Sequence, residues 1–135
     1  MIGRLSEDLL EAVLEGMPLQ ISVVDANDKV VAWNKHETRV FKRPEAVLGR
    51  DVRDCHPKKS LHKVEVILDE MKAGNRETAR FWIDMALTPG EPKRKIMIEY
   101  YALRGGQGNY IGCLEASQDI TEIQKLEGEN RLLDS

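Results

Sequence analysis

Cys55 and His56 are neighbours in this chain, and their side chains are the pair most able to do chemistry together. A thiol and an imidazole form a nucleophilic pair when the two groups meet, but adjacent side chains often point apart. Pro57 gives a plainer explanation, because the residue before a proline avoids the helical region and marks a helix boundary. We favour that boundary over a redox or metal contact. The sequence contains no nucleophile elbow, phosphate-binding loop or metal-hydrolase pattern, so we do not expect an enzyme.

Size and charge limit the classes of protein to which the chain can belong. Its 135 residues make one domain that is large enough for a real core. The net charge of −3 leaves no basic footprint for nucleic acid. No apolar run approaches the roughly 20 residues that span a bilayer, and the N-terminus lacks a signal-peptide core. Cys55 and Cys113 fit neither a disulfide framework nor a zinc site. We expect a cytoplasmic protein that binds neither nucleic acid nor membrane.

The elements that position these residues follow from hydrophobic periodicity and turn signals. Residues 6–15 are predicted as an amphipathic helix with Ser6 as its N-cap. A longer helix is predicted over residues 58–71, and Gly74-Asn75 closes it. Its apolar residues lie on one side of a helical wheel: Leu61, Val64, Ile67, Leu68 and Met71. Strands are predicted over residues 20–24, 29–33, 77–85, 95–104 and 110–118, with a helical segment over 34–41.

The last third of the chain changes its period after the final strand. The glycines of residues 105–108 can supply the positive φ angles of a hairpin turn. Asp119 or Thr121 can then cap a helix, which is predicted over residues 122–135. Apolar positions recur there as a heptad seam, and an Asn in such a seam tends to specify a paired state. The seam consists of Ile123, Leu126, Asn130 and Leu133.

The order of elements resembles the PAS fold, an α+β domain in which helices cover one face of a five-stranded antiparallel sheet. The resemblance extends over residues 9–121 and implies an N-terminal helix over 1–16, a PAS domain over 17–121 and the start of a C-terminal signalling helix over 122–135. Lys42 departs from the pattern of the family, because many members carry Gly at this position. The segments that carry it are Val23-Val24-Asp25, Val30-Val31-Ala32-Trp33-Asn34, Pro44-Glu45-Ala46-Val47-Leu48-Gly49-Arg50, Tyr110-Ile111-Gly112 and Asp119-Ile120-Thr121.

The resemblance implies a ligand pocket between the sheet and the long helix, where members of the family bind haem, flavin or small metabolites. The light-sensing members carry a reactive Cys three residues after the Gly that matches Gly49, and this chain has Val52 there. They also carry a Gln two residues after the Gly that matches Gly112, and this chain has Leu114 there. We therefore do not expect a photoactive flavin.

Haem is the other cofactor that the resemblance implies. Haem-binding relatives use a His on the long helix as the iron ligand, which makes His62 a candidate. On a wheel of about 100° per residue His62 lies opposite the apolar stripe, so it faces water if the stripe faces the pocket. His56 precedes the helix and can turn inward, so either histidine stays open as the ligand. The candidate ligand-binding residues are Cys55, His56, His62, Val64, Leu68, Phe81, Ile98 and Leu114.

Together these patterns predict a sensory and interaction module. A small ligand or a redox change near the long helix would shift the last strands, and the joint at Asp119 and Thr121 would relay the shift to the C-terminal helix. The apolar stripe of residues 6–15 and the heptad seam predict a homodimer. The alternatives are a haem-based gas or redox sensor and a ligand-free dimerisation module. We expect the output partner or domain on another chain or outside these residues.

Overall fold

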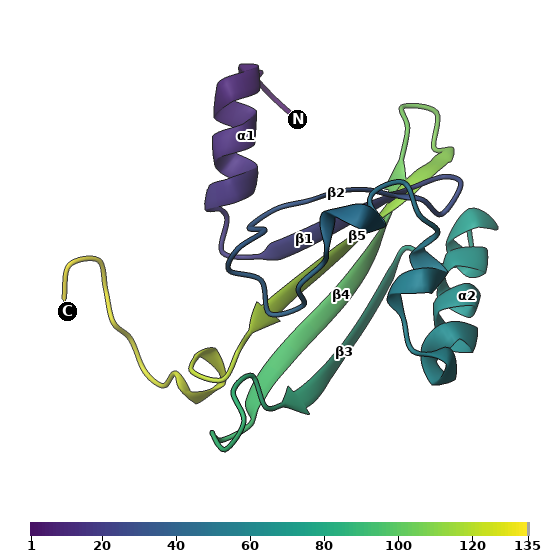
Figure 1. Cartoon of the computed structure of the whole chain (residues 1–135). Coiled ribbons are helices and arrows are strands. Elements are labelled where there is room, and N and C mark those ends of the chain that lie inside the picture. The colour runs from purple at the N-terminus through teal and green to yellow at the C-terminus, as the bar shows by residue number, and fades with distance from the viewer. Residues whose placement is uncertain (135) are drawn as a thin grey trace.

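A five-stranded antiparallel sheet forms the centre of the computed structural model, which describes residues 1–134 (Figure 1). The strands lie in the order β2-β1-β5-β4-β3, so the first and last strands of the chain pair in the middle of the sheet. The predicted α+β class and the antiparallel sheet are therefore confirmed. The main elements are α1 (Glu7–Gly16), β1 (Gln20–Asp25), β2 (Val30–Trp33), α2 (Lys58–Lys72), β3 (Thr78–Met85), β4 (Arg94–Arg104) and β5 (Tyr110–Asp119). Short 3-10 helices are η1 (Glu45–Val47), η2 (Val52–Cys55) and η3 (Ile123–Lys125).

The pairing of β1 with β5 requires a residue without a side chain at position 112. Gly112 lies opposite Asp25 in the register of these two strands. A Cβ atom on Gly112 would lie 2.4 Å from the carbonyl oxygen of Val24, well inside van der Waals contact. The two central strands can approach each other here only because the residue is glycine.

Helix α2 lies against one face of the sheet and buries the predicted apolar stripe. Val64, Leu68 and Met71 are its buried residues. Gly74 follows the helix with a φ angle of 81°, which confirms the predicted left-handed cap. The residues that complete this core come from β1, β2, η2 and β5, namely Val24, Val30, Val52 and Cys113.

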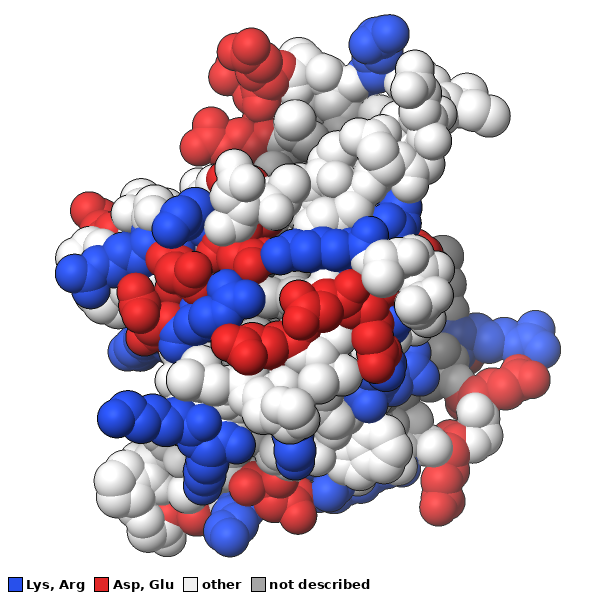
Figure 2. All heavy atoms as spheres, turned by 90° about the vertical axis from the view of Figure 1, so that its right-hand side faces the viewer, with Lys and Arg blue, Asp and Glu red and all other residues white. Residues whose placement is uncertain are grey.

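A buried carboxylate connects α2 to the turn between β1 and β2. Asp28 lies in that turn and is 5% exposed. Its Oδ2 accepts hydrogen bonds from Lys72 Nζ at 2.7 Å and from Arg53 Nη1 at 3.1 Å. Lys72 lies in the last turn of α2 and Arg53 lies in η2, so one carboxylate holds three segments together. Figure 2 shows acidic and basic side chains interleaved over the face of the molecule on which α2 lies.

The helical segment predicted over residues 34–41 is wrong, because this stretch is a series of turns and bends. Lys35 has a φ angle of 52°, which a right-handed helix cannot contain. Arg39 is buried, and its guanidinium donates to the carbonyl oxygens of Asn34 and Phe41. The Asn34 carbonyl is thus bound by a side chain and not by the amide four residues later.

The predicted C-terminal helix is also wrong, since residues 122–134 contain only the single 3-10 turn η3. The rest of this segment extends away from the sheet (Figure 1). Gly128 and Leu133 have φ angles of 63° and 64°, which interrupt a helix. Isolated helices of this length are marginal in water, so a heptad pattern alone does not form one. The residues of the predicted seam therefore share no helical face: Ile123, Leu126, Asn130 and Leu133.

Helix α1 begins at the predicted cap, where Ser6 Oγ accepts a hydrogen bond from the Leu9 N–H at 3.2 Å. Asn34 attaches the other end, because its Nδ2 donates to the Leu14 carbonyl at 2.6 Å. No residue of α1 is buried, and the helix stands away from the sheet (Figure 1). Among the described residues, none of the helices is long and apolar enough to cross a bilayer.

We expect Gly112→Ala to lower the free energy of unfolding by roughly 1–3 kcal/mol, the usual cost of overpacking a well-packed site. The added methyl group would meet the backbone of β1, which cannot move without disturbing the central strand pair. Urea unfolding checks this expectation. Gly106→Ala is the matched control, because a Cβ atom there has no neighbour within 4 Å. Equal stability of the two variants would contradict the steric argument.

Candidate ligand-binding cavity

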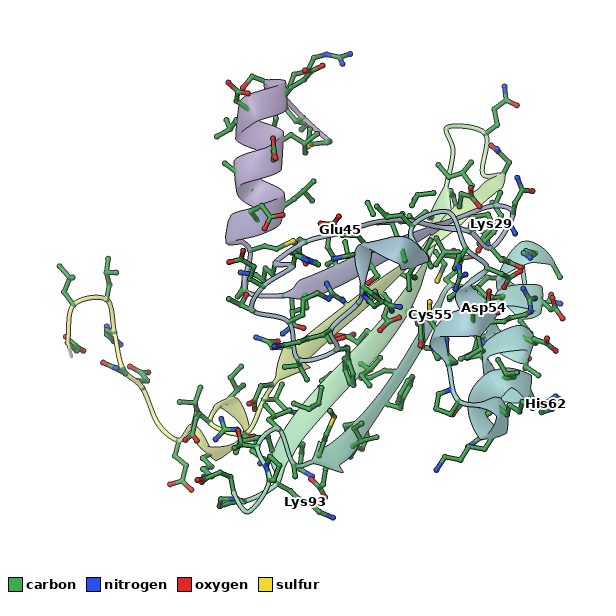
Figure 3. The ribbon with its side chains drawn as sticks, viewed as in Figure 1. Lys29, Glu45, Asp54, Cys55, His62 and Lys93 are labelled. Carbon is green, nitrogen blue, oxygen red and sulfur yellow. The ribbon has the colours of Figure 1, made fainter. Side chains whose placement is uncertain are left out.

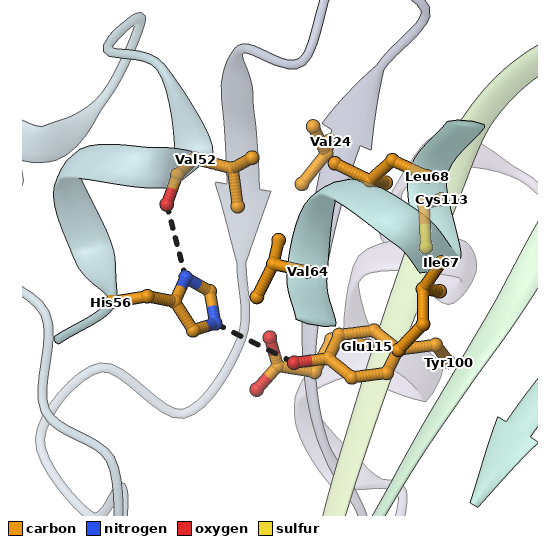
Figure 4. Close-up of a pocket in the computed structure, with 9 residues that line it drawn as sticks. All are labelled: Val24, Val52, His56, Val64, Ile67, Leu68, Tyr100, Cys113 and Glu115. Carbon is orange, nitrogen blue, oxygen red and sulfur yellow. Dashed lines mark hydrogen bonds between the residues drawn. The ribbon is translucent and has the colours of Figure 1, made fainter. Parts of the chain in front are cut away.

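A small cavity lies between α2 and the sheet, at the position expected for a pocket (Figure 4). Its volume is about 20 Å³. A cavity of this size accommodates about one water molecule. Its lining residues are Val24, Val52, His56, Val64, Ile67, Leu68, Tyr100, Cys113 and Glu115.

One wall of the cavity is apolar and comes mainly from α2. Val64, Ile67 and Leu68 belong to the stripe that the helical period places on one side of α2. Val52 of η2 and Val24 of β1 complete this wall. Aliphatic side chains offer no hydrogen bonds, so this wall suits the apolar part of a ligand.

The opposite wall is polar and comes from the paired strands β4 and β5. Tyr100 and Glu115 are partners in the register, and Cys113 lies two residues before Glu115 on the same face of β5. Burial raises the pKa of Tyr100 far above its ordinary value, and the charge of Glu115 adds to the effect. Burial also raises the pKa of Cys113 to about 12. Both groups stay protonated at neutral pH, so Cys113 is not a reactive thiolate.

His56 lies where η2 leads into α2. Its backbone is extended, with φ of −123° and ψ of 146°, as expected for the residue before Pro57. The Nδ1 atom of the ring lies 3.1 Å from the carbonyl oxygen of Val52. Nε2 lies 3.5 Å from the hydroxyl oxygen of Tyr100 (Figure 4). The imidazole therefore lies between η2 and the polar wall.

Two guanidinium groups and a carboxylate are buried beside the cavity. Arg43 Nη2 lies 3.4 Å from Glu115 Oε2, and both side chains are 10% exposed. Ser22 Oγ accepts hydrogen bonds from Arg43 Nε at 3.1 Å and from Arg39 Nη2 at 3.0 Å. Burial lowers the pKa of Arg39, and the charge of Arg43 lowers it further. These contacts hold the irregular segment after β2 against the sheet and orient the Glu115 carboxylate.

Among the predicted ligand residues, His56, Val64 and Leu68 line the cavity. Cys55 instead packs against the core beside it (Figure 3), and burial raises the pKa of its thiol. Leu114 does not line the cavity, because side chains alternate along β5 and its two neighbours point into the cavity.

The other three predicted residues lie outside the cavity lining. The Phe81 ring lies 5.8 Å from that of Tyr100, and Ile98 is buried in the sheet. His62 is exposed, and Figure 3 shows it on the outer side of α2. This is the direction that the helical wheel predicted for His62.

Several lining residues were not among the predicted ligand contacts. Once Cys113 is placed toward the core, alternation along the strand also places Glu115 there, so this residue could have been found. The approach of Tyr100 to Glu115 could not have been found, because it depends on the register between β4 and β5. The full set that was missed is Val24, Val52, Ile67, Tyr100, Cys113 and Glu115.

The cavity does not fit a haem group. His62 lies on the outer side of α2, away from the cavity. His56 reaches the cavity, but the volume of about 20 Å³ in this closed arrangement is far below that of a haem. Within residues 1–134, no three or more His, Cys, Asp or Glu side chains form a group that could hold a metal ion.

The joint after β5 is fixed by Asp119 and Thr121. Asp119 Oδ1 accepts hydrogen bonds from the Thr121 amide at 3.0 Å and from its hydroxyl at 2.7 Å. Asp119 Oδ2 accepts from Arg94 Nε at 2.8 Å, and Thr121 Oγ1 accepts from the Lys95 amide at 2.8 Å. Burial alone would raise the pKa of Asp119, but the hydrogen bonds from Arg94 and Thr121 outweigh it and lower the pKa.

Stability should depend on the ionised form of Asp119. Its folded-state pKa lies below the unfolded value of about 3.9, so the ionised carboxylate stabilises the folded protein above that pH. This contribution is lost as the pH falls through the folded-state pKa. We expect Asp119→Asn to lower the free energy of unfolding at neutral pH, and the difference from wild type to shrink below about pH 4.

Urea unfolding at neutral pH and at about pH 3 measures this difference. Asp54→Asn is the control, because Asp54 is exposed and lies in η2, away from the joint (Figure 3). A difference between wild type and Asp119→Asn that stays constant with pH would show that the ionised carboxylate is not what stabilises the joint.

Comparison with known proteins gives one family and several similar structures. The family model of the PAS domain matches residues 10–121. No curated protein matches the chain. A C-terminal domain from Streptococcus mutans is 29% identical, with a TM-score of 0.81, and the alignment covers 94% of each chain.

Two more distant structures share the fold. A sensory box sensor histidine kinase from Vibrio cholerae is 18% identical, with a TM-score of 0.57, over 84% of this chain and 90% of that one. VqmA bound to DPO, also from Vibrio cholerae, is 18% identical, with a TM-score of 0.58, over 83% of this chain and 56% of that one. The family match covers most of the chain, and the structures named above share its fold. The chain belongs to the PAS domain family.

Proposed function

We propose that this PAS domain binds a small ligand in the cavity between α2 and the sheet and relays binding through the joint at Asp119 and Thr121. Three polar side chains converge on an otherwise mostly aliphatic cavity, and this convergence is the main support for the proposal: His56, Tyr100 and Glu115. A mostly apolar concave site with a few convergent polar groups is the usual form of a small-molecule site. VqmA, a structural neighbour, is described as bound to DPO, which also favours ligand binding.

The cavity and the joint lie on the same two strands. Tyr100 lies on β4, which begins at Arg94, and Glu115 lies on β5, which ends at Asp119. Arg94 and Asp119 form the ion pair of the joint at 2.8 Å. A change in the spacing of β4 and β5 at the cavity would therefore reach the joint through a continuous ladder of hydrogen bonds. The relay requires that the ligand bind two arrangements of these strands with different affinity.

Room for a ligand larger than one water molecule requires α2 to move away from the sheet. Ligand pockets commonly have volumes of about 300–1,000 Å³. The cavity in this structure has about 20 Å³, so it corresponds to a closed arrangement. The Asp28 carboxylate and its partners on α2 and η2 would resist this movement. Ligand binding would then be coupled to the position of α2.

We expect Val64→Phe to abolish ligand binding, because the larger side chain fills the cavity from α2. A fragment library screened by ligand-observed NMR on the full chain measures the loss. Val66→Phe is the control, since Val66 is on the same helix but exposed. The proposal is wrong if no fragment binds wild type, or if every fragment that does also binds Val64→Phe equally well.

A second function, dimerisation, is favoured by the apolar side of α1. Leu9 and Val13 are 52% and 44% exposed, and no residue of α1 is buried in the single chain. A helix with an exposed apolar stripe gains stability by packing the stripe against a partner. We propose that the partner is α1 of a second copy. This dimer does not depend on residues 122–134, and it could form whether or not the cavity binds a ligand.

The double variant Leu9→Glu with Val13→Glu is expected to be monomeric, because it would place four carboxylates in the interface of a symmetric dimer. Sedimentation equilibrium gives the mass of the particle, and far-UV circular dichroism checks that the domain stays folded. Glu11→Gln, on the same helix, should leave the dimer intact. A wild-type chain that is monomeric at all accessible concentrations would overturn the dimer.

A further inference from the structure

His56 presents a hydrogen-bond acceptor to the polar wall of the cavity. Its Nδ1 atom lies 3.1 Å from the Val52 carbonyl oxygen. A carbonyl oxygen can only accept, so Nδ1 carries the proton of this hydrogen bond. In the neutral ring the other nitrogen, Nε2, then has a free lone pair and no proton. Nε2 is the atom that faces the Tyr100 hydroxyl (Figure 4).

Glu115 provides a second acceptor on the same wall. An ionised carboxylate accepts hydrogen bonds and donates none. Arg43 approaches its Oε2 at 3.4 Å, which is longer than the roughly 2.7–2.9 Å of a strong charge-assisted hydrogen bond. The carboxylate lies beside the Tyr100 hydroxyl in Figure 4. It can therefore accept a further hydrogen bond from a ligand in the cavity.

The Tyr100 hydroxyl faces His56 Nε2, with the Glu115 carboxylate beside it (Figure 4). Its oxygen is 3.5 Å from His56 Nε2, beyond the roughly 2.5–3.0 Å of an ordinary hydrogen bond from a hydroxyl. The volume of about 20 Å³ admits one water-sized group next to them. A hydroxyl or N–H group at this position would donate to Nε2 or to Glu115, and a hydroxyl would also accept from Tyr100.

The nearby guanidinium groups do not reverse the preference of the cavity for a hydrogen-bond donor over an anion. Neither Arg39 nor Arg43 lines the cavity. Arg39 donates to backbone carbonyls and to Ser22 Oγ, and Arg43 donates to Ser22 Oγ and to Glu115. The ionised group that does line the cavity is the Glu115 carboxylate, so an anionic ligand would meet a like charge.

We propose that the cavity selects small apolar molecules that carry a neutral hydroxyl or N–H donor. His56 Nε2 and Glu115 receive the donor, and Val64, Ile67 and Leu68 contact the apolar part. A ligand without a donor would bury these acceptors unpaired, which weakens binding. This selectivity rests on the ligand-binding function proposed above.

Phenol and toluene test the selectivity, because they are close in size and differ in the hydroxyl group. Benzoate is the anionic probe. Each is titrated into the ¹⁵N-labelled full chain, and affinities are taken from amide shifts of the lining residues. We expect phenol to bind at least about tenfold more tightly than toluene, and benzoate to bind more weakly than phenol. In Ile67→Ala, which enlarges the cavity, both phenol and toluene should bind more tightly with the same preference.

His56→Phe and Tyr100→Phe keep a ring at each position and remove the polar atoms. Both variants should bind phenol several-fold more weakly, and neither should bind toluene more weakly than wild type, because toluene no longer buries these polar atoms unpaired. A variant that misfolds would lose both ligands, so the toluene measurement separates lost recognition from lost structure. His62→Ala is the matched control, because this histidine is exposed on α2 and should change neither affinity.

Two results would overturn the proposal in different ways. Equal affinities for phenol and toluene, or tighter binding of benzoate, would show that donor selectivity is wrong while ligand binding in the cavity stands. If none of the three probes shifts the lining residues, in wild type or in Ile67→Ala, the donor selectivity and the ligand-binding function are both wrong.

Discussion

The buried carboxylate of Asp28 is the interaction on which the arrangement of this domain depends. It lies in the turn between the two N-terminal strands and receives hydrogen bonds from Lys72 at the end of α2 and from Arg53 in η2. Removing either partner would leave the buried carboxylate with less compensation for its charge, which is costly in a buried site. This attachment joins the last turn of α2 and η2 to the turn between β1 and β2.

The cavity combines two kinds of wall because two kinds of element meet there. Helix α2 contributes aliphatic residues at helical spacing, and the paired strands β4 and β5 contribute Tyr100, Cys113 and Glu115 on one face. The same strands end at the Arg94–Asp119 ion pair, where the chain leaves the sheet. A ligand that separates the two walls would thus act on strands whose ends are fixed by charge. The fold places recognition and relay on one pair of strands.

The segment after β2 shows how one side chain can decide local structure. Arg39 is 3% exposed, and its hydrogen bonds to carbonyl oxygens replace those that a helix would have formed. Its neighbour Arg43 contacts Glu115 in the cavity wall, so the irregular segment also supports the site. The helix predicted from the heptad seam after β5 does not form, for a related reason. A periodic pattern forms a helix only where the backbone and a packing surface agree with it.

Local sequence patterns were sufficient to predict the order of the five strands and the two main helices, the α+β class, the cap at Ser6, the helix stop at Gly74 and the outward direction of His62. These depend on local turn chemistry and on periods of two and 3.6 residues, which can be read from neighbouring positions. Three long-range contacts come from the three-dimensional arrangement: the hydrogen bond from Arg39 to the Ile21 carbonyl, the pairing of Tyr100 with Glu115 and the approach of His56 to that pair. These contacts join residues 15 or more positions apart and depend on strand register and helix position, which no local pattern encodes.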